Sequence, residues 1–442
     1  MKRCAAALVV SLAALVAPLG AQGGQPLVVR ASATPCLTLR AAPRSDAAPL
    51  ACLLPGTAVT ADSAVPFWRR ILSPGGTRGW SANKFLDSAT VPGAAVANDP
   101  PVQPGGLPSA NAIPDSAWLE IHIVDVGQGD GIWITTWDDG NPGNGRFDGR
   151  NIVIDGGPDA SDERNEFLKY IMARAHDGAV IDALIVTHPH NDHYPGARGI
   201  LRKFDVCAYY DPDTPNGVDF DRFIAEVHDA RCGGEPPAMH RGFANFGQPR
   251  WGTELGVDFL WGGPIDAAAP GMGSGGTRIN NGSVVLKLTY GTQSFLFMGD
   301  AEGKERSDDP ATPKYAEAAM LADSAVAAKL KSTVIKLAHH GSETSSTLPF
   351  LRAVDPAVVV VSSGRRAYSG TYLPDLSTLL RYCAHNSQIR IYRTDRNDAA
   401  EGRTTTTDAD GDHVVIRTNG RETIVQASSA GMPFNPPVSC AP

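Results

Sequence analysis

The chain has 442 residues, of which 42% are hydrophobic and 19% charged, and its formal net charge is −8. This apolar content is enough for at least one large core, and at about 150 residues per domain there is room for roughly three domains. The mildly acidic balance lacks the basic footprint of non-specific nucleic-acid binding, so a nucleic-acid substrate would need a local basic pocket.

The first residues predict a secretory signal peptide over residues 1–21. A basic start precedes an apolar run, 5–18, and the small residues Gly20 and Ala21 follow this run. This run is short for a bilayer, and no later segment reaches the ~18 apolar residues that a spanning helix needs. We therefore expect cleavage near Ala21, no membrane span, and a mature protein that is secreted or periplasmic.

Six of the seven cysteines follow the signal peptide, an even number that suits an oxidising compartment in which disulfides form. Buried free thiols are the alternative, and six cysteines allow several connectivities between which the sequence does not decide. None of the six has the spacing of a metal-binding pair. We expect the local pairings, which join Cys36 with Cys52, Cys207 with Cys232, and Cys383 with Cys440.

Residues 28–87 consist of short β-like runs separated by turn signals. The runs lie at 37–40, 53–60, 67–71 and 79–86, and this pattern is typical of a small β-barrel. Their order also resembles bacterial SH3-like domains, with an L-x-L-R opening, an L-x-x-G-T middle and a G-W end. The resemblance implies a cell-wall peptide as partner, while a spacer barrel without a ligand is equally compatible with the fold.

Residues 88–116 contain six prolines among Ala, Gly and Ser, with almost no large apolar residues, which is the composition of a semi-extended linker. Residues 117–442 then alternate strands with helices and form an α/β domain. We expect strands at 119–124, 132–134, 152–155, 181–186, 284–290, 294–297, 334–337, 358–361 and 388–392, and helices at 165–175, 314–331 and 376–384.

The strand at 181–186 leads directly into a loop that carries four potential metal ligands within six residues. His188 and His190 are two apart on extended chain and can share one ion, while Asp192 and His193 turn toward a second. Imidazole and carboxylate suit zinc, with manganese or iron as alternatives. A solitary histidine would be structural, but this density at a strand end indicates two divalent ions.

The pattern His-x-His-x-Asp-His resembles that of the metallo-β-lactamase superfamily. Further motifs, in the expected order over about 118–425, resemble the extracellular hydrolase domain of the ComEC-type competence proteins. The resemblance is to the detached hydrolase and not to a DNA importer, and it implies a four-layer αββα sandwich. The motifs are Asp125-Val126-Gly127-Gln128-Gly129-Asp130, Ile154-Asp155-Gly156-Gly157, Asn280-Asn281-Gly282-Ser283, Met298-Gly299-Asp300 and His339-His340-Gly341-Ser342.

By position in these motifs, the resemblance implies that Asp300 bridges the two ions. One histidine of the pair at 339–340 would complete the site of Asp192 and His193. We favour His340 as the ligand and His339 as a group that supports the ligands or handles protons. Either Asp192 or the histidine that binds no ion would protonate the leaving group. Paired ions about 3.5–4 Å apart lower the pKa of a bridging water and supply hydroxide at neutral pH.

The first ion lacks one protein ligand in this assignment. Many superfamily members place another histidine before the bridging aspartate, but here only His228 and His240 lie in that interval, outside any clear motif. A surface histidine is the more common explanation for each. The first site would then hold His188, His190, Asp300 and water, which is an open, catalytic arrangement.

Two further groups flank this predicted centre. Asp125 and Asp155 are expected to organise loops beneath the metals rather than to bind them. Arg365 and Arg366 follow a strand end and have the guanidinium geometry to clamp a phosphate. A solvated arginine pair is the alternative, and the more common one.

Three functions compete. A phosphodiesterase or nuclease, acting on a small-molecule or nucleic-acid phosphodiester, is favoured by the ComEC-type motifs and by Asp300. Hydrolysis of a lactone or β-lactam is the second, although the superfamily's β-lactamases generally lack an aspartate at this position. The third is a non-catalytic cell-wall-binding protein with a degenerate hydrolase domain, against which the intact ligand motifs argue.

Overall fold

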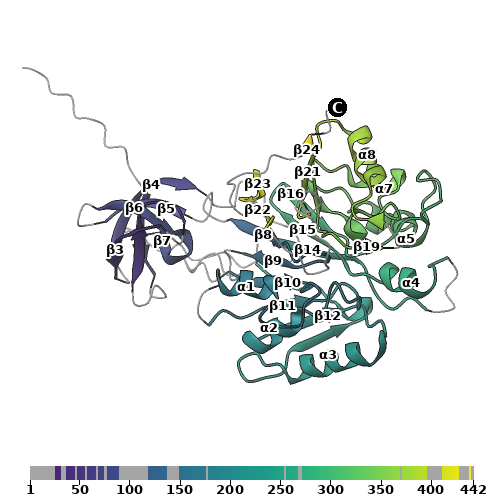
Figure 1. Cartoon of the computed structure of the whole chain (residues 1–442), viewed down its shortest axis with the longest axis horizontal. Helices are drawn as coiled ribbons and strands as arrows, with labels where there is room; N and C mark the ends of the chain where they lie inside the picture. Colours follow the sequence, from purple (N-terminus) through teal and green to yellow (C-terminus); the bar gives the residue numbers. More distant parts are fainter. Residues whose placement is uncertain are drawn as a thin grey trace, which may run out of the picture. The chain divides into compact units, whose positions relative to one another are not determined.

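The computed structural model of the chain divides between Asn98 and Asp99 into two compact units (Figure 1). The predicted signal peptide at 1–21 and, apart from Ser88, the predicted linker at 88–116 lie outside the described residues, so these boundaries remain predictions. The structure describes residues 25–30, 36–44, 47–54, 57–65, 68–73, 77–88, 118–136, 149–175, 178–252, 255–266, 271–368, 371–395, 411–427 and 438–439.

The first unit is a strand-rich β domain, as predicted. Its described strands form one seven-stranded sheet in the order β3-β2-β6-β5-β4-β1-β7, and a small core gathers Leu39, Ile71 and their neighbours. The disulfide Cys36–Cys52 joins the residue before β2 to β3 and confirms the first predicted pairing. Its assignment as SH3-like stays a prediction. The elements are β1 Gln25–Val29, β2 Leu37–Arg40, β3 Pro49–Leu53, β4 Ala58–Val65, β5 Trp68–Leu72, β6 Arg78–Ala82, η1 Asn83–Phe85 and β7 Leu86–Ser88.

Two mixed sheets form the centre of the second unit. The eight-stranded sheet has the order β13-β12-β11-β10-β9-β8-β22-β23, and the seven-stranded sheet has the order β14-β15-β16-β17-β18-β21-β24. The first contains β8 Leu119–Ile123, β9 Ile132–Thr135, β10 Asn151–Ile154, β11 Ala183–Ile185, β12 Ala208–Asp211, β13 Ala238–Arg241, β22 Val414–Thr418 and β23 Thr423–Ala427. The second contains β14 Leu255–Trp261, β15 Val285–Tyr290, β16 Gln293–Phe297, β17 Val334–Lys336, β18 Val358–Val361, β21 Arg390–Arg393 and β24 Val438–Ser439.

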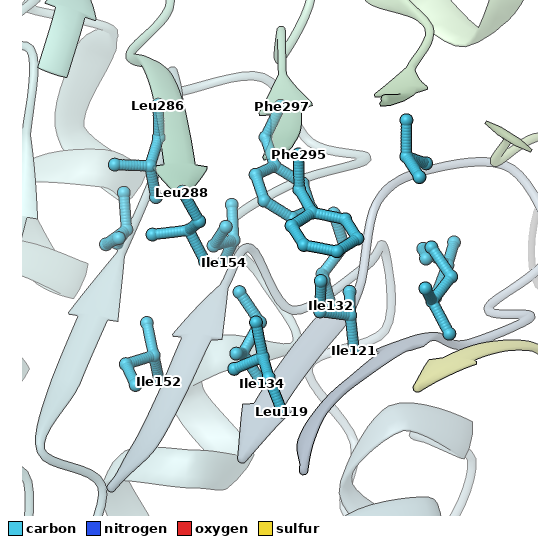
Figure 2. Close-up of a cluster of buried hydrophobic side chains, with 14 of the residues drawn as sticks. Leu119, Ile121, Ile132, Ile134, Ile152, Ile154, Leu286, Leu288, Phe295 and Phe297 are labelled. Carbon is cyan, nitrogen blue, oxygen red and sulfur yellow. The ribbon is translucent and has the colours of Figure 1, made fainter. Parts of the chain in front are cut away.

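The sheets pack face to face through alternate side chains of their strands. Ile121, Ile132 and Ile154 come from one sheet and Leu286 and Phe295 from the other, and Figure 2 shows them meeting in a single apolar layer. The residues between them on each strand point outward, because successive side chains of a strand alternate between its faces. Each sheet therefore has a second apolar face that needs a cover.

Helices provide that cover and complete the αββα sandwich. Phe167 on α1 and Phe223 on α3 pack on the outer face of the first sheet, while Met320 on α5 and Phe350 on α7 pack on the second. The helices are α1 Glu166–Met172, α2 Ala197–Lys203, α3 Gly217–Asp229, α4 Gly275–Asn281, α5 Tyr315–Ala322, α6 Ser324–Ala327, α7 Leu348–Val354 and α8 Leu376–His385, with the short η3 Phe243–Asn245 and η4 Ala338–Gly341 and the hairpin β19 Ala367–Tyr368 and β20 Thr371–Tyr372.

The single helix expected at 314–331 is wrong, because the chain breaks at Asp323 into α5 and α6. The backbone of Asp323 is extended, with φ −81° and ψ 108°, and its carboxylate accepts hydrogen bonds from the N–H groups of Ala325 and Val326. Aspartate caps a helix N-terminus well, so the residue restarts the helix instead of continuing it.

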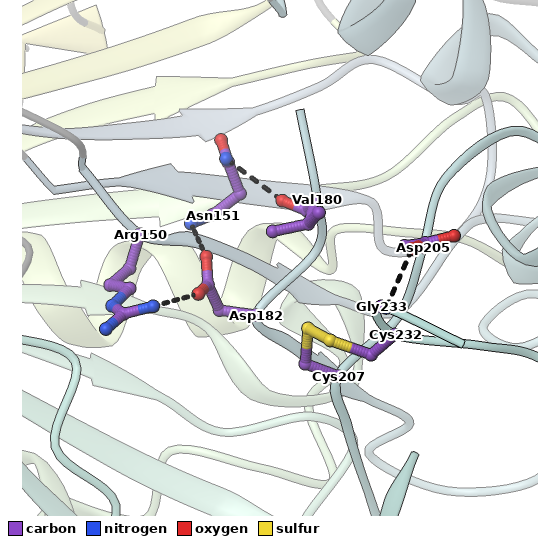
Figure 3. Close-up of a disulfide and its surroundings, with 8 residues drawn as sticks. All are labelled: Arg150, Asn151, Val180, Asp182, Asp205, Cys207, Cys232 and Gly233. Atoms are coloured by element: carbon purple, nitrogen blue, oxygen red, sulfur yellow. Dashed lines mark hydrogen bonds and ion pairs between the residues drawn. A yellow bond between two sulfur atoms is a disulfide. The ribbon is translucent and has the colours of Figure 1, made fainter. Parts of the chain in front are cut away.

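A second disulfide, Cys207–Cys232, ties the start of β12 to the segment after α3 and confirms its predicted pairing (Figure 3). Cys383 is also disulfide-bonded, but Cys440, its predicted partner, lies outside the described residues. Among the residues that the structure describes, no helix combines the length and the apolar character needed to cross a membrane.

Candidate metal centre

The predicted ligand loop starts at the carboxyl end of β11 and is held by Asp155, which follows β10. The Asp155 carboxylate accepts hydrogen bonds from the Thr187 N–H and the Thr187 hydroxyl, each at 2.7 Å, and lies 2.8 Å from His193 Nδ1. The packing is close, since a Cβ atom on Gly196 would collide with the carbonyl oxygen of Gly156. Asp155 therefore organises the loop, in agreement with its predicted role.

The three histidines of this loop converge through their ring nitrogens. His188 Nε2 lies 3.0 Å from His190 Nδ1, and the rings of His188 and His193 have centroids 4.1 Å apart. His188 and His193 are fully buried and Asp192 is buried, whereas His190 keeps an exposed edge. The spacing of the motif thus brings its four side chains to one point.

Asp300 enters this point from the second sheet, three residues after β16. Its N–H donates to Ser283 Oγ at 3.0 Å, which fixes the turn. Asp300 Oδ2 lies 3.6 Å from His188 Nε2 and 3.4 Å from His193 Nε2, while Oδ1 lies 3.5 Å from His340 Nε2. The Asp300 carboxylate therefore lies within reach of His188 and also of His193 and His340.

His340, rather than His339, points into the cluster. Both residues have a left-handed backbone, with φ 49° at His339 and 52° at His340, so the chain turns sharply after β17 and sends the two rings in different directions. His340 Nδ1 is held 2.8 Å from the Ser362 carbonyl, and its Nε2 lies 3.6 Å from Asp192 Oδ2.

His339 lies beside the cluster, against a buried carboxyl group. Its Nδ1 is 3.3 Å from Glu302 Oε1 and 3.0 Å from Thr344 Oγ1, and its side chain is 25% exposed. Burial raises the pKa of Glu302 to about 8 and lowers the pKa of His339 to about 4, so both groups favour their neutral forms.

A buried ion pair supports the cluster from below. Lys336, the last residue of β17, donates a hydrogen bond to Asp130 Oδ2, and Asp130 Oδ1 lies 3.5 Å from His340 Nδ1. Burial would raise the pKa of Asp130, but the Lys336 ammonium together with His340 and His193 lowers this pKa to about 2. An ionised Asp130 can therefore help to hold the His340 ring in place.

The buried donor atoms at the centre fit divalent metal ions. His193 Nε2, His340 Nε2 and Asp300 Oδ1 are buried without a hydrogen-bond partner, although buried polar atoms are normally paired. Ligand atoms of His188, His193 and Asp300 lie within 4.8 Å of one another, and so do those of Asp192, His193 and His340. Imidazole nitrogens and carboxylate oxygens in this number are the donor set that zinc and similar ions take.

The side chains of the cluster have strongly shifted pKa values. Burial lowers the pKa of His188 well below its usual value. Burial opposes the charged form of His193 too, but the Asp300 and Asp155 carboxylates raise its pKa well above the usual range. For Asp300, the nearby His340 and His193 overcome burial and lower the pKa well below normal. Perturbations of this size are typical of functional sites.

Neither of the two remaining candidate histidines reaches the cluster. His228 is exposed on α3, and His240 stacks on Tyr210, with ring centroids 4.5 Å apart, while its Nδ1 contacts the Asn245 carbonyl at 2.9 Å. Arg365 lies past the end of β18, and its guanidinium carbon is 4.0 Å from the ring centre of Tyr372.

Sequence reasoning assigned no role to Lys336 or Glu302 and gave Asn280 none beyond its place in a motif. All three come from segments far from the histidine loop in the sequence, and single acidic, basic or amide residues have no local signature. The presence of Asn280 in the Asn-Asn-x-Ser motif was the one signal available.

Residues 146–365 match the family described as the metallo-beta-lactamase superfamily. ComE operon protein 3 of Bacillus subtilis is 25% identical over 64% of this chain and 33% of its own length. Recombination protein 2 of Haemophilus influenzae is 26% identical over 64% of this chain and 30% of its own length. The chain thus spans about a third of the length of these relatives. Among solved structures, Zn(2+)-bound PqqB from Methylobacterium extorquens is similar at 11% identity and a TM-score of 0.35, over 62% of this chain and 97% of that one.

Proposed function

The chain carries a domain of the metallo-β-lactamase superfamily, and from that premise we propose that it is an exported two-metal hydrolase of phosphodiesters, including nucleic acids. The observation that carries the proposal is the double orientation of Asp300, whose Oδ2 faces His188 and His193 while Oδ1 faces His340. A carboxylate between two ligand sets is the arrangement of paired-ion phosphatases and nucleases.

In this proposal His188, His190 and Asp300 hold the first ion. Asp192, His193, His340 and the shared Asp300 hold the second. Zinc is the ion we expect, with manganese or iron as alternatives. Such a pair, when bound, lowers the pKa of a water between the ions and neutralises the charge that develops on a phosphoryl group.

The chain's own residues set the tautomers of the buried histidines. Asp155 accepts from His193 Nδ1 at 2.8 Å and the Ser362 carbonyl accepts from His340 Nδ1 at 2.8 Å. With the Nδ1 proton committed in each ring, Nε2 is the atom that points into the cluster and would bind an ion once it has lost its own proton. Both rings are therefore oriented for a cation before any ion arrives.

Protonation of the leaving oxygen falls to His339 rather than to Asp192 in this proposal. Asp192 is engaged by ring nitrogens on both sides, 3.9 Å from His193 Nε2 and 3.6 Å from His340 Nε2. His339 is 25% exposed and has Glu302 behind it at Nδ1. The neutral His339 ring can give its Nε2 proton to the leaving oxygen and take a proton at Nδ1 from the protonated Glu302 carboxyl group. The exposed ring then regains a proton at Nε2 from solvent and returns the other to Glu302.

Export fits the two described disulfides, which persist in oxidising compartments. A cell-wall peptide remains the proposed partner of the first unit. Both proposals concern where the hydrolase acts and are independent of the metal chemistry.

A substrate panel tests the proposed activity. Protein loaded with Zn²⁺ or Mn²⁺ is assayed on bis-p-nitrophenyl phosphate, single-stranded DNA, nitrocefin and a lactone, with chelator-treated protein as the control. We expect metal-dependent cleavage of the two phosphodiesters and rates near background on the other two. Turnover of nitrocefin or the lactone alone would assign the cyclic amide or ester activity instead, and a loaded protein inert on all four would support the non-catalytic alternative.

A further inference from the structure

The proposed first ion has two imidazoles and one shared carboxylate, and so one protein ligand fewer than the second. The histidine that many superfamily members use has no counterpart here, because His228 and His240 both lie elsewhere. Any further protein donor for this ion would therefore come from a different residue type near His190.

Asn280 has an unsatisfied oxygen in this region. It lies in the last turn of α4, is 5% exposed, and its Oδ1 is buried without a hydrogen-bond partner. Its Nδ2 donates to Glu302 Oε1 at 2.7 Å. The same Nδ2 lies 3.5 Å from His339 Nε2, so the nitrogen end of the amide faces Glu302 and His339 and the Oδ1 end faces away from Glu302.

The direction in which Asn280 points follows from the helix. Gly276 and Asn280 are four residues apart, so they share one face of α4. A Cβ atom on Gly276 would lie 3.8 Å from His190 Nε2, which places that face against His190.

The adjacent residue shows what a purely structural amide does here. Asn281 Oδ1 accepts from the Glu302 N–H at 3.0 Å and its Nδ2 donates to the Met272 carbonyl at 3.3 Å. Both ends of Asn281 are thus engaged with backbone, whereas Asn280 has one end engaged and one end open. An orphaned buried carbonyl oxygen costs free energy unless a partner completes it.

We propose that Asn280 Oδ1 is the third protein ligand of the ion held by His188 and His190. The inference rests on the two-metal centre of the proposed function and adds a ligand to it. Each ion then has two imidazole nitrogens and two oxygens, with Asp300 shared. Because the amide is neutral, the first ion keeps more of its charge than the second, and carbonyl oxygen shifts its preference toward harder ions such as Mn²⁺.

Metal binding to Asn280→Ala tests this assignment without using activity. Wild type and variant are titrated with Zn²⁺ and with Mn²⁺ by calorimetry, and the Co²⁺ forms are compared by visible absorption. We expect the variant to bind its weaker ion at least about 10-fold less tightly, to keep the other ion, and to shift the Co²⁺ bands of the first site. Asn280→Asp, which retains an oxygen, should keep both ions, and Asn386→Ala at the end of α8 is the matched control.

The outcomes separate the two proposals. Unchanged affinities and an unchanged Co²⁺ spectrum in Asn280→Ala would overturn the ligand assignment, and a loss of rate alone would leave Asn280 as a support for Glu302. If the alanine variant does not fold, the spectrum of Asn280→Asp decides, since a carboxylate ligand alters the bands and a distant one does not. If ion binding depends on Asn280 but the loaded wild-type protein cleaves no phosphodiester, the proposed function is wrong and the ligand assignment still holds.

Discussion

His339 and His340 are consecutive residues with different surroundings, and the difference predicts a selective loss of rate. His340 faces Asp192 and Asp300, whereas His339 faces Glu302 and Thr344. Changing His339 to Ala should lower kcat on bis-p-nitrophenyl phosphate by about 100-fold or more, because a general acid contributes at least that much. The bound metal, measured by elemental analysis, should stay at the wild-type level. If the His339→Ala variant instead loses a bound ion, His339 is a metal ligand and not the general acid.

Arg365 provides a second test at the scale of one side chain. Its guanidinium lies over the Tyr372 ring on the hairpin that follows Ser362, the residue whose carbonyl holds His340. If it binds the substrate phosphate, Arg365→Ala should lower kcat/KM for bis-p-nitrophenyl phosphate by about tenfold, the typical effect of a lost hydrogen bond to a charged group. Arg365→Lys should recover only part, since the planar fork is missing. Kinetics equal to wild type would identify a solvated pair, and Arg352→Ala on α7 serves as the control.

Individual site residues could be predicted from the sequence where several potential ligands lie close together along the chain. The four side chains of the loop at 188–193 fall within six residues, so their shared purpose is visible without a fold. The supporting residues Asp130, Lys336 and Glu302 reach the same place from separate strand ends, and their pairing is visible only in three dimensions. The choice between His339 and His340 needed the left-handed turn after β17.

At the scale of elements, a buried ion pair joins β8 to β22. Glu120 and Arg417 are cross-strand partners, with Glu120 Oε1 2.8 Å from Arg417 Nε, and Arg417 also stacks on Trp118. Glu120→Gln should lower the free energy of unfolding by about 3 kcal/mol, because it leaves a buried charge without its partner. The exposed pair Glu166–Lys169 gives the control, and Glu166→Gln should change stability by less than about 1 kcal/mol.

The same pair has a predicted pH signature. Burial would raise the pKa of Glu120, but hydrogen bonding to His122 and the Arg417 charge lower it below 4.5. A depressed folded-state pKa stabilises the fold above the unfolded value, and that stability is lost as pH falls through the folded value. The difference in unfolding free energy between wild type and Glu120→Gln, measured by urea denaturation, should therefore be constant above about pH 5 and shrink below it. A difference that is independent of pH down to acid unfolding would contradict the pair's contribution.

The disulfide Cys207–Cys232 makes a prediction about the segment around α3. It closes a loop with a sequence separation of 25, beside Asp182, which accepts from Arg150 and from the Asn151 N–H (Figure 3). The double variant Cys207→Ala/Cys232→Ala should lose about 3 kcal/mol by the loop-entropy estimate, measured by urea denaturation of the second unit.

The Cys36→Ala/Cys52→Ala variant is the matched control for this measurement. It removes a bond within the first unit, which has a hydrophobic core of its own, and should leave the transition of the second unit in place. If the Cys207→Ala/Cys232→Ala variant is as stable as wild type, this disulfide does not stabilise the second unit.

Element prediction succeeded where the pattern was strong and local. Val358–Val361 is a fully buried strand and was predicted at those residues. The helices α2 and α7 were not predicted, because Gly199 lies inside α2 and Pro349 inside α7, and both residue types weaken a helical pattern as short as seven residues. The break at Asp323 was missed because alanine-rich sequence on both sides favours a helix, and only the cap interrupts it.

At the scale of the whole molecule, the two-sheet arrangement explains why the centre forms where it does. β11 supplies the histidine loop from one sheet, while β16 and β17 supply Asp300 and His340 from the other. Neither sheet carries a complete ligand set alone. The fold class could be predicted because the motifs come in a recognisable order. The elements of the segment 205–275 could not be predicted, since no motif marks β12, α3, β13 or β14.

The central claim is that two ions share Asp300, and metal content tests it most directly. Elemental analysis of the folded wild-type protein should find close to two ions per chain. His190→Ala and Asp300→Ala, each checked for a native circular dichroism spectrum, should lose them, with the larger loss in Asp300→Ala because that carboxylate serves both sites. A wild-type protein with no bound metal, or an Asp300→Ala variant that still holds two ions, would contradict the account.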